Sequence, residues 1–126
     1  MKYLLMIFAD ADRPWTGSDA DRAGMADLFA VQAELRASGE YLDGIGLDDA
    51  NTALTVRVRE GIPVVSDGPF AEAKEQFAGY MLLQCDRSRA VEIAARVSAG
   101  QDFPVQIQPV MEEEAMRAEA APGPAG

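Results

Sequence analysis

The segment Asp67-Gly68-Pro69 contains the residues of this sequence that are best placed to do chemistry. Asp67 follows an apolar segment that is typical of a strand, and the chain then turns at Gly68 and Pro69. Glycine permits unusual backbone angles and proline stiffens the chain, so the turn should fix the direction of the carboxylate. Asp67 is therefore a candidate acid/base or ligand anchor, with Phe70 and Tyr80 as neighbours that would alter its pKa. The alternative is an Asx-turn, in which the carboxylate only accepts backbone N–H groups.

Further charged residues lie close to this turn in the sequence. Glu72, Lys74 and Glu75 alternate in sign just after it, which would let a lysine and a carboxylate converge on one ligand. Arg57 and Arg59 occupy alternate positions of a predicted strand, so they share a face and are candidates for binding an acidic group. Both groups have a structural alternative, because charge runs are often solvated surface and arginines on a hairpin protect its edges.

The bulk composition excludes several classes of site. The 126-residue chain has no histidine and a single cysteine, Cys85, so the usual zinc and iron ligand sets are missing and we expect no metal and no cofactor. A net charge of -10 argues against nucleic acid and anionic membranes as partners, since both are bound largely by surplus lysine and arginine. The sequence shows neither a signal-peptide pattern nor an apolar run of about 18 residues, and we expect a cytoplasmic protein.

Hydrophobic periodicity predicts helices alternating with strands. The most distinct helix begins after Ser18, which has an acidic residue three positions later, and it ends near Gly39. A second helix is predicted from Asp86 or Ser88 to Gly100. Strands are predicted at residues 2–9, 40–47, 52–59, 62–66, 79–85 and 103–110. This order predicts an α+β fold with a ferredoxin-like β-α-β-β-α-β core and an added hairpin at 52–66.

The predicted fold leaves one face of the sheet without a cover. Two helices cover only one face, yet the strands at 2–9 and 79–85 are apolar on both. A second sheet is the simplest cover, so we expect a homodimer packed sheet against sheet. The domain is expected at residues 1–110, followed by an acidic and then Ala/Pro/Gly-rich tail at 111–126. That tail is expected to extend a helix over 112–120 and to be partly disordered at its end.

The segment from Asp67 to Gln76 (DGPFAEAKEQ), followed by Ala78-Gly79-Tyr80, resembles the YCII-related family, in the branch named for its DGPF motif. The opening MKYLLMI, followed by Asp10, and the Thr55-Val56-Arg57 strand are also similar to that family. The usual pattern has threonine where this chain has Ala73. The resemblance covers about residues 1 to 110 and implies a dimeric α/β barrel.

The same resemblance implies two different kinds of activity. Relatives include enzymes that eliminate chloride from chlorinated lactones, with a histidine–aspartate pair proposed for acid/base work in a cleft near the dimer interface. Asp67 matches that aspartate, but this chain has no histidine to pair with it. Many members of the branch are encoded near extracytoplasmic-function sigma factors, which implies a regulatory or ligand-sensing role.

These observations lead to one main hypothesis and two alternatives. The main hypothesis is a homodimer that binds a small organic molecule in a cleft, where Asp67 orients the ligand. Arg57 or Lys74 would balance an acidic group, and Phe70 and Tyr80 would supply apolar wall. The first alternative is a lyase or isomerase with Asp67 as base and Tyr80 or Lys74 as acid. The second is an interaction module for a sigma factor that uses the acidic surface or tail.

Overall fold

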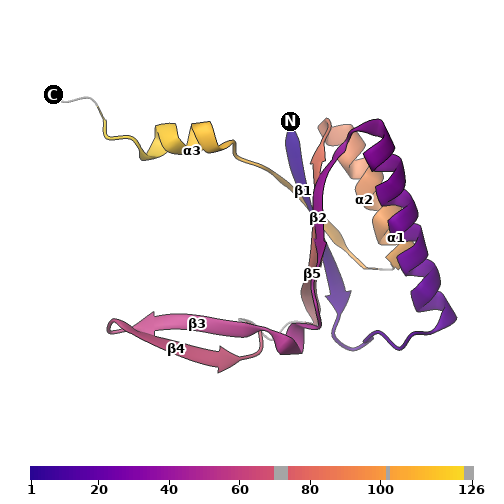
Figure 1. Ribbon diagram of the computed structural model, residues 1–126, viewed down its shortest axis with the longest axis horizontal. Helices are drawn as coiled ribbons and strands as arrows, with labels where there is room; N and C mark the ends of the chain where they lie inside the picture. Colours follow the sequence, from indigo (N-terminus) through magenta and orange to yellow (C-terminus); the bar gives the residue numbers. More distant parts are fainter. Residues whose placement is uncertain (70–73, 102, 124–126) are drawn as a thin grey trace.

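The computed structural model describes residues 1–69, 74–101 and 103–123, so Phe70, Ala71, Glu72 and Ala73 lie outside the described residues. A four-stranded antiparallel sheet carries two helices, and a separate hairpin and a short helix project from it (Figure 1). The strands are β1 (Lys2–Asp10), β2 (Tyr41–Gly46), β3 (Leu54–Arg59), β4 (Ile62–Asp67), β5 (Glu75–Gln84) and β6 (Val105–Pro109). The helices are α1 (Asp19–Ser38), the 3₁₀ turn η1 (Ala50–Thr52), α2 (Arg87–Gln101) and α3 (Glu113–Ala120).

The main sheet has the order β2-β5-β1-β6, and each neighbouring pair is antiparallel. Strands β3 and β4 form their own two-stranded sheet with the register expected of a hairpin. Helices α1 and α2 both lie on one face of the main sheet (Figure 1). The mixed α+β arrangement with antiparallel sheets is consistent with the predicted ferredoxin-like fold.

Helix α1 forms where the capping signals predict it. The N–H of Asp21 donates a hydrogen bond to Ser18 Oγ at 3.1 Å. The carboxylate of Asp21 accepts from the backbone and hydroxyl of Thr16, so the cap also fixes the preceding loop. At the other end Gly39 takes the left-handed conformation, φ 80°, and its N–H donates to the carbonyl of Arg36. Both ends of the helix are therefore set by local sequence.

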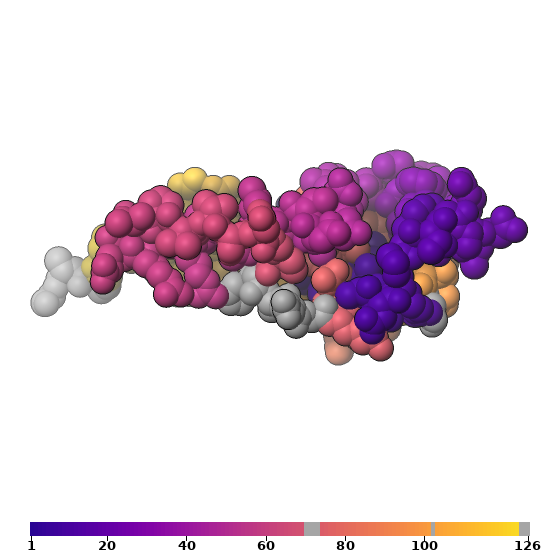
Figure 2. Space-filling model, turned by 90° about the horizontal axis from the view of Figure 1, so that it is seen from below, coloured from indigo at the N-terminus to yellow at the C-terminus, as the bar shows by residue number. Residues whose placement is uncertain are grey.

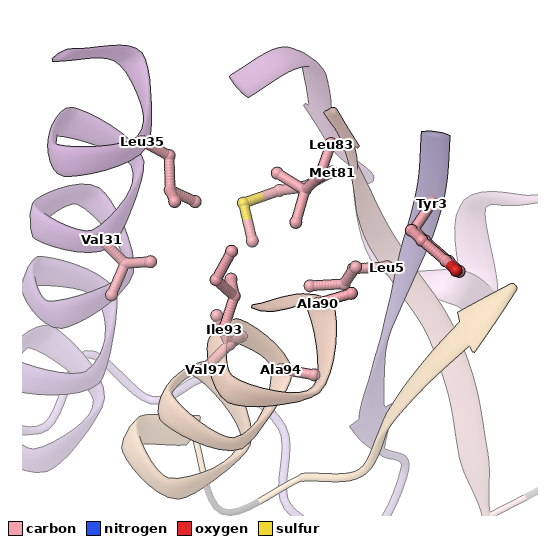
Figure 3. Packing of buried hydrophobic residues seen from close by; sticks show 10 residues of the cluster. All are labelled: Tyr3, Leu5, Val31, Leu35, Met81, Leu83, Ala90, Ile93, Ala94 and Val97. Atoms are coloured by element: carbon pink, nitrogen blue, oxygen red, sulfur yellow. The ribbon is translucent and has the colours of Figure 1, made fainter. Parts of the chain in front are cut away.

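The hydrophobic core lies between these two helices and the sheet (Figure 3). Leu5 and Tyr3 of β1 and Met81 and Leu83 of β5 supply the sheet side. The helical side is contributed by Val31 and Leu35 of α1 and by Ala90, Ile93, Ala94 and Val97 of α2. These residues have exposures between 0% and 6%, which means that the helix-covered face alone forms a closed core.

Strand β5 is longer than the sequence predicts. Residues 75–78, which we expected in the charged connection, continue the strand and pair with the far end of β1. A register irregularity between Ile7 and Phe8 allows this pairing, and the rings of Phe8 and Phe77 lie 6.0 Å apart. The predicted start at Gly79 is wrong because residues 75–77 pair with β1 beyond the irregularity, a contact between distant segments that the local sequence does not show.

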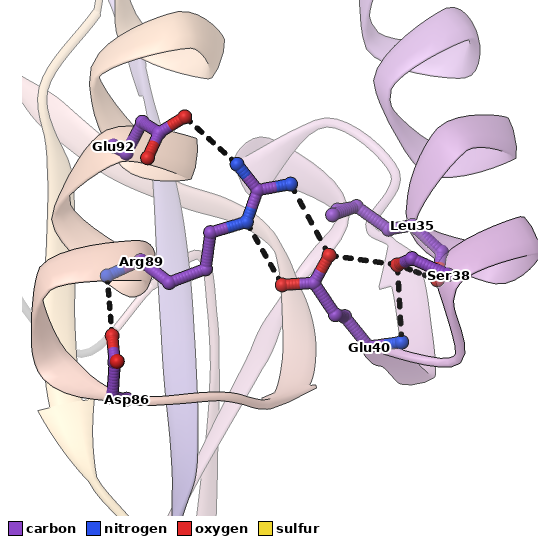
Figure 4. A network of polar contacts seen from close by, with 6 residues as sticks. All are labelled: Leu35, Ser38, Glu40, Asp86, Arg89 and Glu92. Atoms are coloured by element: carbon purple, nitrogen blue, oxygen red, sulfur yellow. Dashed lines mark hydrogen bonds and ion pairs between the residues drawn. The ribbon is translucent and has the colours of Figure 1, made fainter.

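An ion-pair network joins the end of α1 to the start of α2 (Figure 4). The guanidinium of Arg89 contacts both carboxylate oxygens of Glu40, at 2.8 and 3.1 Å, and also contacts Glu92 at 2.8 Å. Ser38 Oγ donates to Glu40 at 2.7 Å. Asp86 accepts the N–H of Arg89 and thereby caps α2, as one of the two predicted caps. The network ties α2 to the segment that connects α1 to β2.

Among the described residues, no helix covers the opposite face of the main sheet (Figure 1). Along β1 the side chains alternate, with Tyr3 and Leu5 buried and Leu4 and Met6 half-buried, and β5 shows the same alternation around Leu82. We call the face formed by Leu4, Met6, Ile45, Tyr80 and Leu82 the open face. The β3–β4 hairpin and α3 both project on this side, away from α1 and α2 (Figures 1 and 2).

Candidate functional site

The turn after β4 is anchored to the start of β3. Gly68 has φ 94°, a conformation that side-chain-bearing residues rarely adopt, and its N–H donates to the carbonyl of Ala53 at 2.7 Å. The hydroxyl of Thr55 donates to the carbonyl of Gly68 at 2.9 Å. Both backbone groups of the glycine therefore have hydrogen-bond partners at the start of β3, while the predicted fixing of the Asp67 carboxylate stays a prediction.

Beside this turn lies a hollow of about 520 Å³ at the root of the hairpin. One wall is the segment from the end of β2 through η1, and the other is the beginning of β5. The described lining residues are Leu47, Asp48, Asp49, Ala50, Thr52, Ala53, Pro69, Glu75, Gln76 and Phe77. The lining combines apolar surface with three carboxylates, a mixture that suits a small molecule with both apolar and polar groups.

Two of these carboxylates also stabilise the local backbone. Asp49 accepts the N–H of Asn51 at 3.1 Å and so caps η1, while Asp48 accepts the N–H of Asp49 at 2.7 Å. The N–H of Leu47 donates to the carbonyl of Ala78 at 2.8 Å, which fastens this segment to β5. A backbone hydrogen bond thus connects the two walls of the hollow.

Asp67 lies at the end of β4, opposite Leu54, and is exposed. Among the described residues its carboxylate makes no side-chain hydrogen bond or ion pair, and the Asx-turn alternative stays open because Phe70, the next residue with an N–H after Gly68, lies outside the described residues. Asp67 is separated from the lining residue Pro69 by one residue. Its role as an acid, a base or a ligand anchor stays a prediction.

The other predicted site residues are not among the described lining of the hollow. Arg57 is exposed on the hairpin, opposite Val64. Lys74 is exposed directly before Glu75, and its carbonyl accepts the N–H of Ala11 at 2.7 Å. Its charge acts on Asp10, whose pKa is lowered chiefly by a hydrogen bond from the N–H of Asp12, with Lys74 as a further contributor. Phe70 lies outside the described residues.

Tyr80 lies farther along β5, on the open face. Its hydroxyl donates a hydrogen bond to Asp43 Oδ2 at 3.2 Å, and Ile45 is its partner across the sheet. Burial and the neighbouring Asp43 carboxylate raise the pKa of Tyr80, so the hydroxyl stays protonated through the physiological range. The structure therefore pairs Tyr80 with Asp43, a residue that the sequence did not single out.

The sequence also did not reveal most of the hollow's lining. Residues 47–53 were predicted only as the end of one strand, a turn and the start of the next strand, because nothing local in them marks a site. The available signal was weak: Asp49, two residues before Asn51, is an ordinary cap for a short turn. Residues 47–53 lie opposite the beginning of β5 because the chain turns back toward the main sheet there, and this contact between distant segments leaves no local signal in the sequence.

Comparison with known proteins decides the family. The model of the YCII-related domain matches residues 1–114 of this chain. The chain belongs to the YCII-related family. It is also 34% identical over 87 residues to an uncharacterised protein of Rhizobium meliloti (strain 1021), a match that covers 68% of this chain and 69% of that protein.

Two further findings concern the described residues of this YCII-related protein. Within residues 1–69, 74–101 and 103–123, no group of three or more Cys, Asp or Glu side chains is arranged to hold a metal ion. None of the helices in these ranges is long and apolar enough to cross a membrane.

Proposed function

We propose that the protein is a homodimer that binds a small organic molecule in the hollow at the root of the β3–β4 hairpin. The observation that carries this proposal is the hollow itself. Its volume of about 520 Å³ lies within the ~300–1,000 Å³ typical of small-molecule sites. Its described lining is mixed apolar and polar, and the turn after β4 contributes Pro69 to it.

The predicted residues take their roles around the mouth of this hollow. Asp67 orients the ligand from the end of β4, and Lys74 or Arg57 balances an acidic group on it. Pro69 and Phe77, which line the hollow, supply apolar surface. Tyr80 extends that surface along β5 in this proposal, while Phe70, the other predicted apolar residue, lies outside the described residues. Because the DGPF motif includes the turn, we also place the chain in the DGPF-motif branch of the YCII-related family.

The homodimer in this proposal is supported by two surfaces that lack a cover among the described residues. The open face presents half-buried apolar side chains along β1 and β5. The hairpin has no buried residue, and Leu54, Val56 and Val58 are 60–67% exposed. An isolated two-stranded hairpin is marginally stable in water, so a second copy that packs on the open face and against the hairpin would stabilise both.

A thermal-shift screen of the full chain tests the binding proposal. We expect at least one member of a library of small carboxylic acids and amines to raise the melting temperature. A ligand present at 100 times its dissociation constant adds about 2.7 kcal/mol to the free energy of unfolding. Ala50→Trp fills the hollow from η1 and should abolish the shift, whereas Ala33→Trp, at an exposed site on α1, should keep it. Equal shifts in the two variants would contradict the assignment of the ligand to this hollow.

A further inference from the structure

Helix α3 has an ion pair between Glu113 and Arg117 but no buried side chain to stabilise it within its own chain. It contains eight residues, none of them buried, and Glu112 at its N-terminus makes no side-chain capping hydrogen bond. Met111, just before the helix, is 61% exposed, and Met116, within the helix, is 53% exposed. Isolated helices shorter than about 12–15 residues are marginal in water, so α3 needs a surface to pack on.

The root of α3 is held on the open-face side of the sheet. The N–H of Val110 donates to the carbonyl of Lys2 at 3.0 Å, and Lys2 Nζ forms an ion pair with Glu112 at 3.7 Å. Lys2 shares its side of β1 with Leu4 and Met6, which belong to the open face. The ion pair therefore directs the tail to that side, and α3 projects away from α1 and α2 (Figure 1).

The length of α3 matches the distance to a second sheet. Eight helical residues span about 12 Å at ~1.5 Å per residue. Two sheets that pack face to face lie ~10 Å apart. A helix that starts at the edge of one sheet and points away from its own helices must therefore pass alongside a sheet stacked on the open face.

We infer that α3 is an arm that packs against the second copy of this chain, with Met116 as its main apolar contact. The inference rests on the proposed homodimer and adds a contact outside the YCII-related domain, whose match ends at residue 114. A second copy is the favoured occupant because the surface at the root of the arm is the same open face that this copy covers. Each chain contributes one arm, so a twofold dimer contains the contact twice.

Substitution of Met116 in the full chain tests this inference. We expect Met116→Lys to raise the dimer dissociation constant at least about tenfold in sedimentation velocity, since it places a charge in an apolar contact. The matched control is Val91→Lys, at a residue of α2 that is 50% exposed on the far side of the sheet and should leave the constant unchanged. Equal dissociation constants for Met116→Lys and the unsubstituted chain would overturn the arm while leaving the dimer in place.

A photo-reactive phenylalanine analogue at position 116 gives an independent test. We expect irradiation to produce covalent dimers, and mass spectrometry to place the cross-link on the partner's copy of the chain. Cross-links only within one chain, or none at all in a dimeric sample, would overturn the inference. A full chain that is monomeric at micromolar concentration would overturn both the arm and the proposed homodimer. The ligand-induced shifts in melting temperature of Ala50→Trp and Ala33→Trp test the binding site in the hollow independently of the arm.

Discussion

Gly68 and Asp67 are adjacent, yet the fold uses them differently. The glycine supplies a backbone conformation with φ 94°, donates its N–H to the carbonyl of Ala53 and accepts a hydrogen bond from the hydroxyl of Thr55. The aspartate closes the β3–β4 ladder through its backbone, while its carboxylate has no partner among the described residues. The described hydrogen bonds of the turn therefore involve the glycine and not the carboxylate, so a substitution of Asp67 can test the carboxylate separately from the turn.

Asp67→Asn separates the two roles. Because the carboxylate makes no described contact, we expect the free energy of unfolding to change by no more than about 0.5 kcal/mol, as is usual for exposed sites. The ligand-induced shift in melting temperature should fall at the same time, since the orienting charge is lost. Chemical denaturation measures the first quantity and the thermal-shift screen the second. A large loss of stability would mean that the Asp67 carboxylate mainly stabilises the turn.

At the scale of the elements, glycines determine how closely β2 approaches β5. A Cβ added to Gly79 would lie 2.6 Å from the carbonyl oxygen of Ile45, a fixed backbone atom. We expect Gly79→Ala to destabilise the protein by about 1–3 kcal/mol, because the strands must separate to admit the methyl group. Gly46 is the β2 partner of Gly79, and a Cβ there meets nothing within 4 Å. Gly46→Ala is therefore the control, and urea denaturation of both variants should show a clear difference.

The ion-pair network at the end of α1 should make the stability of the protein depend on pH. The hydrogen bond from Arg89, followed by that from Ser38, lowers the pKa of Glu40 below its ordinary value of 4.5. A lowered folded-state pKa contributes stability that is present above pH ~4.5 and is lost as the pH falls through the folded value. Glu40→Gln should therefore lower the melting temperature at neutral pH, and its difference from the unsubstituted chain should shrink below pH 4.5. A difference independent of pH would exclude the ion pair as the cause.

The elements that the sequence predicts well are those with local signals. Ser18 and Gly39 bound α1, and alternation marks the hairpin, so both are found within a few residues. The start of β5 was missed because its pairing with β1 depends on an irregularity at Ile7 and Phe8 that no local pattern shows. In the candidate site, too, some parts have local sequence signals and others do not. The turn follows from its residue types, but the opposite wall at 47–53 depends on contacts between distant segments.

At the scale of the whole molecule, the open face gives the sharpest test of the proposed dimer. Leu82 is half-buried at the centre of this face and pairs with Leu4 and Asp43 on neighbouring strands. A lysine at position 82 would place its charge in the middle of the proposed sheet-on-sheet interface, where the loss of an apolar contact and the desolvation of a charge weaken binding most. We expect Leu82→Lys to shift the protein to monomer at micromolar concentration, with a dissociation constant at least about tenfold higher. Circular dichroism should confirm that the variant is folded, since the core on the helix-covered face is untouched. Val91→Lys should remain a dimer, and a Leu82→Lys variant that dimerises as well as this control would contradict sheet-on-sheet association.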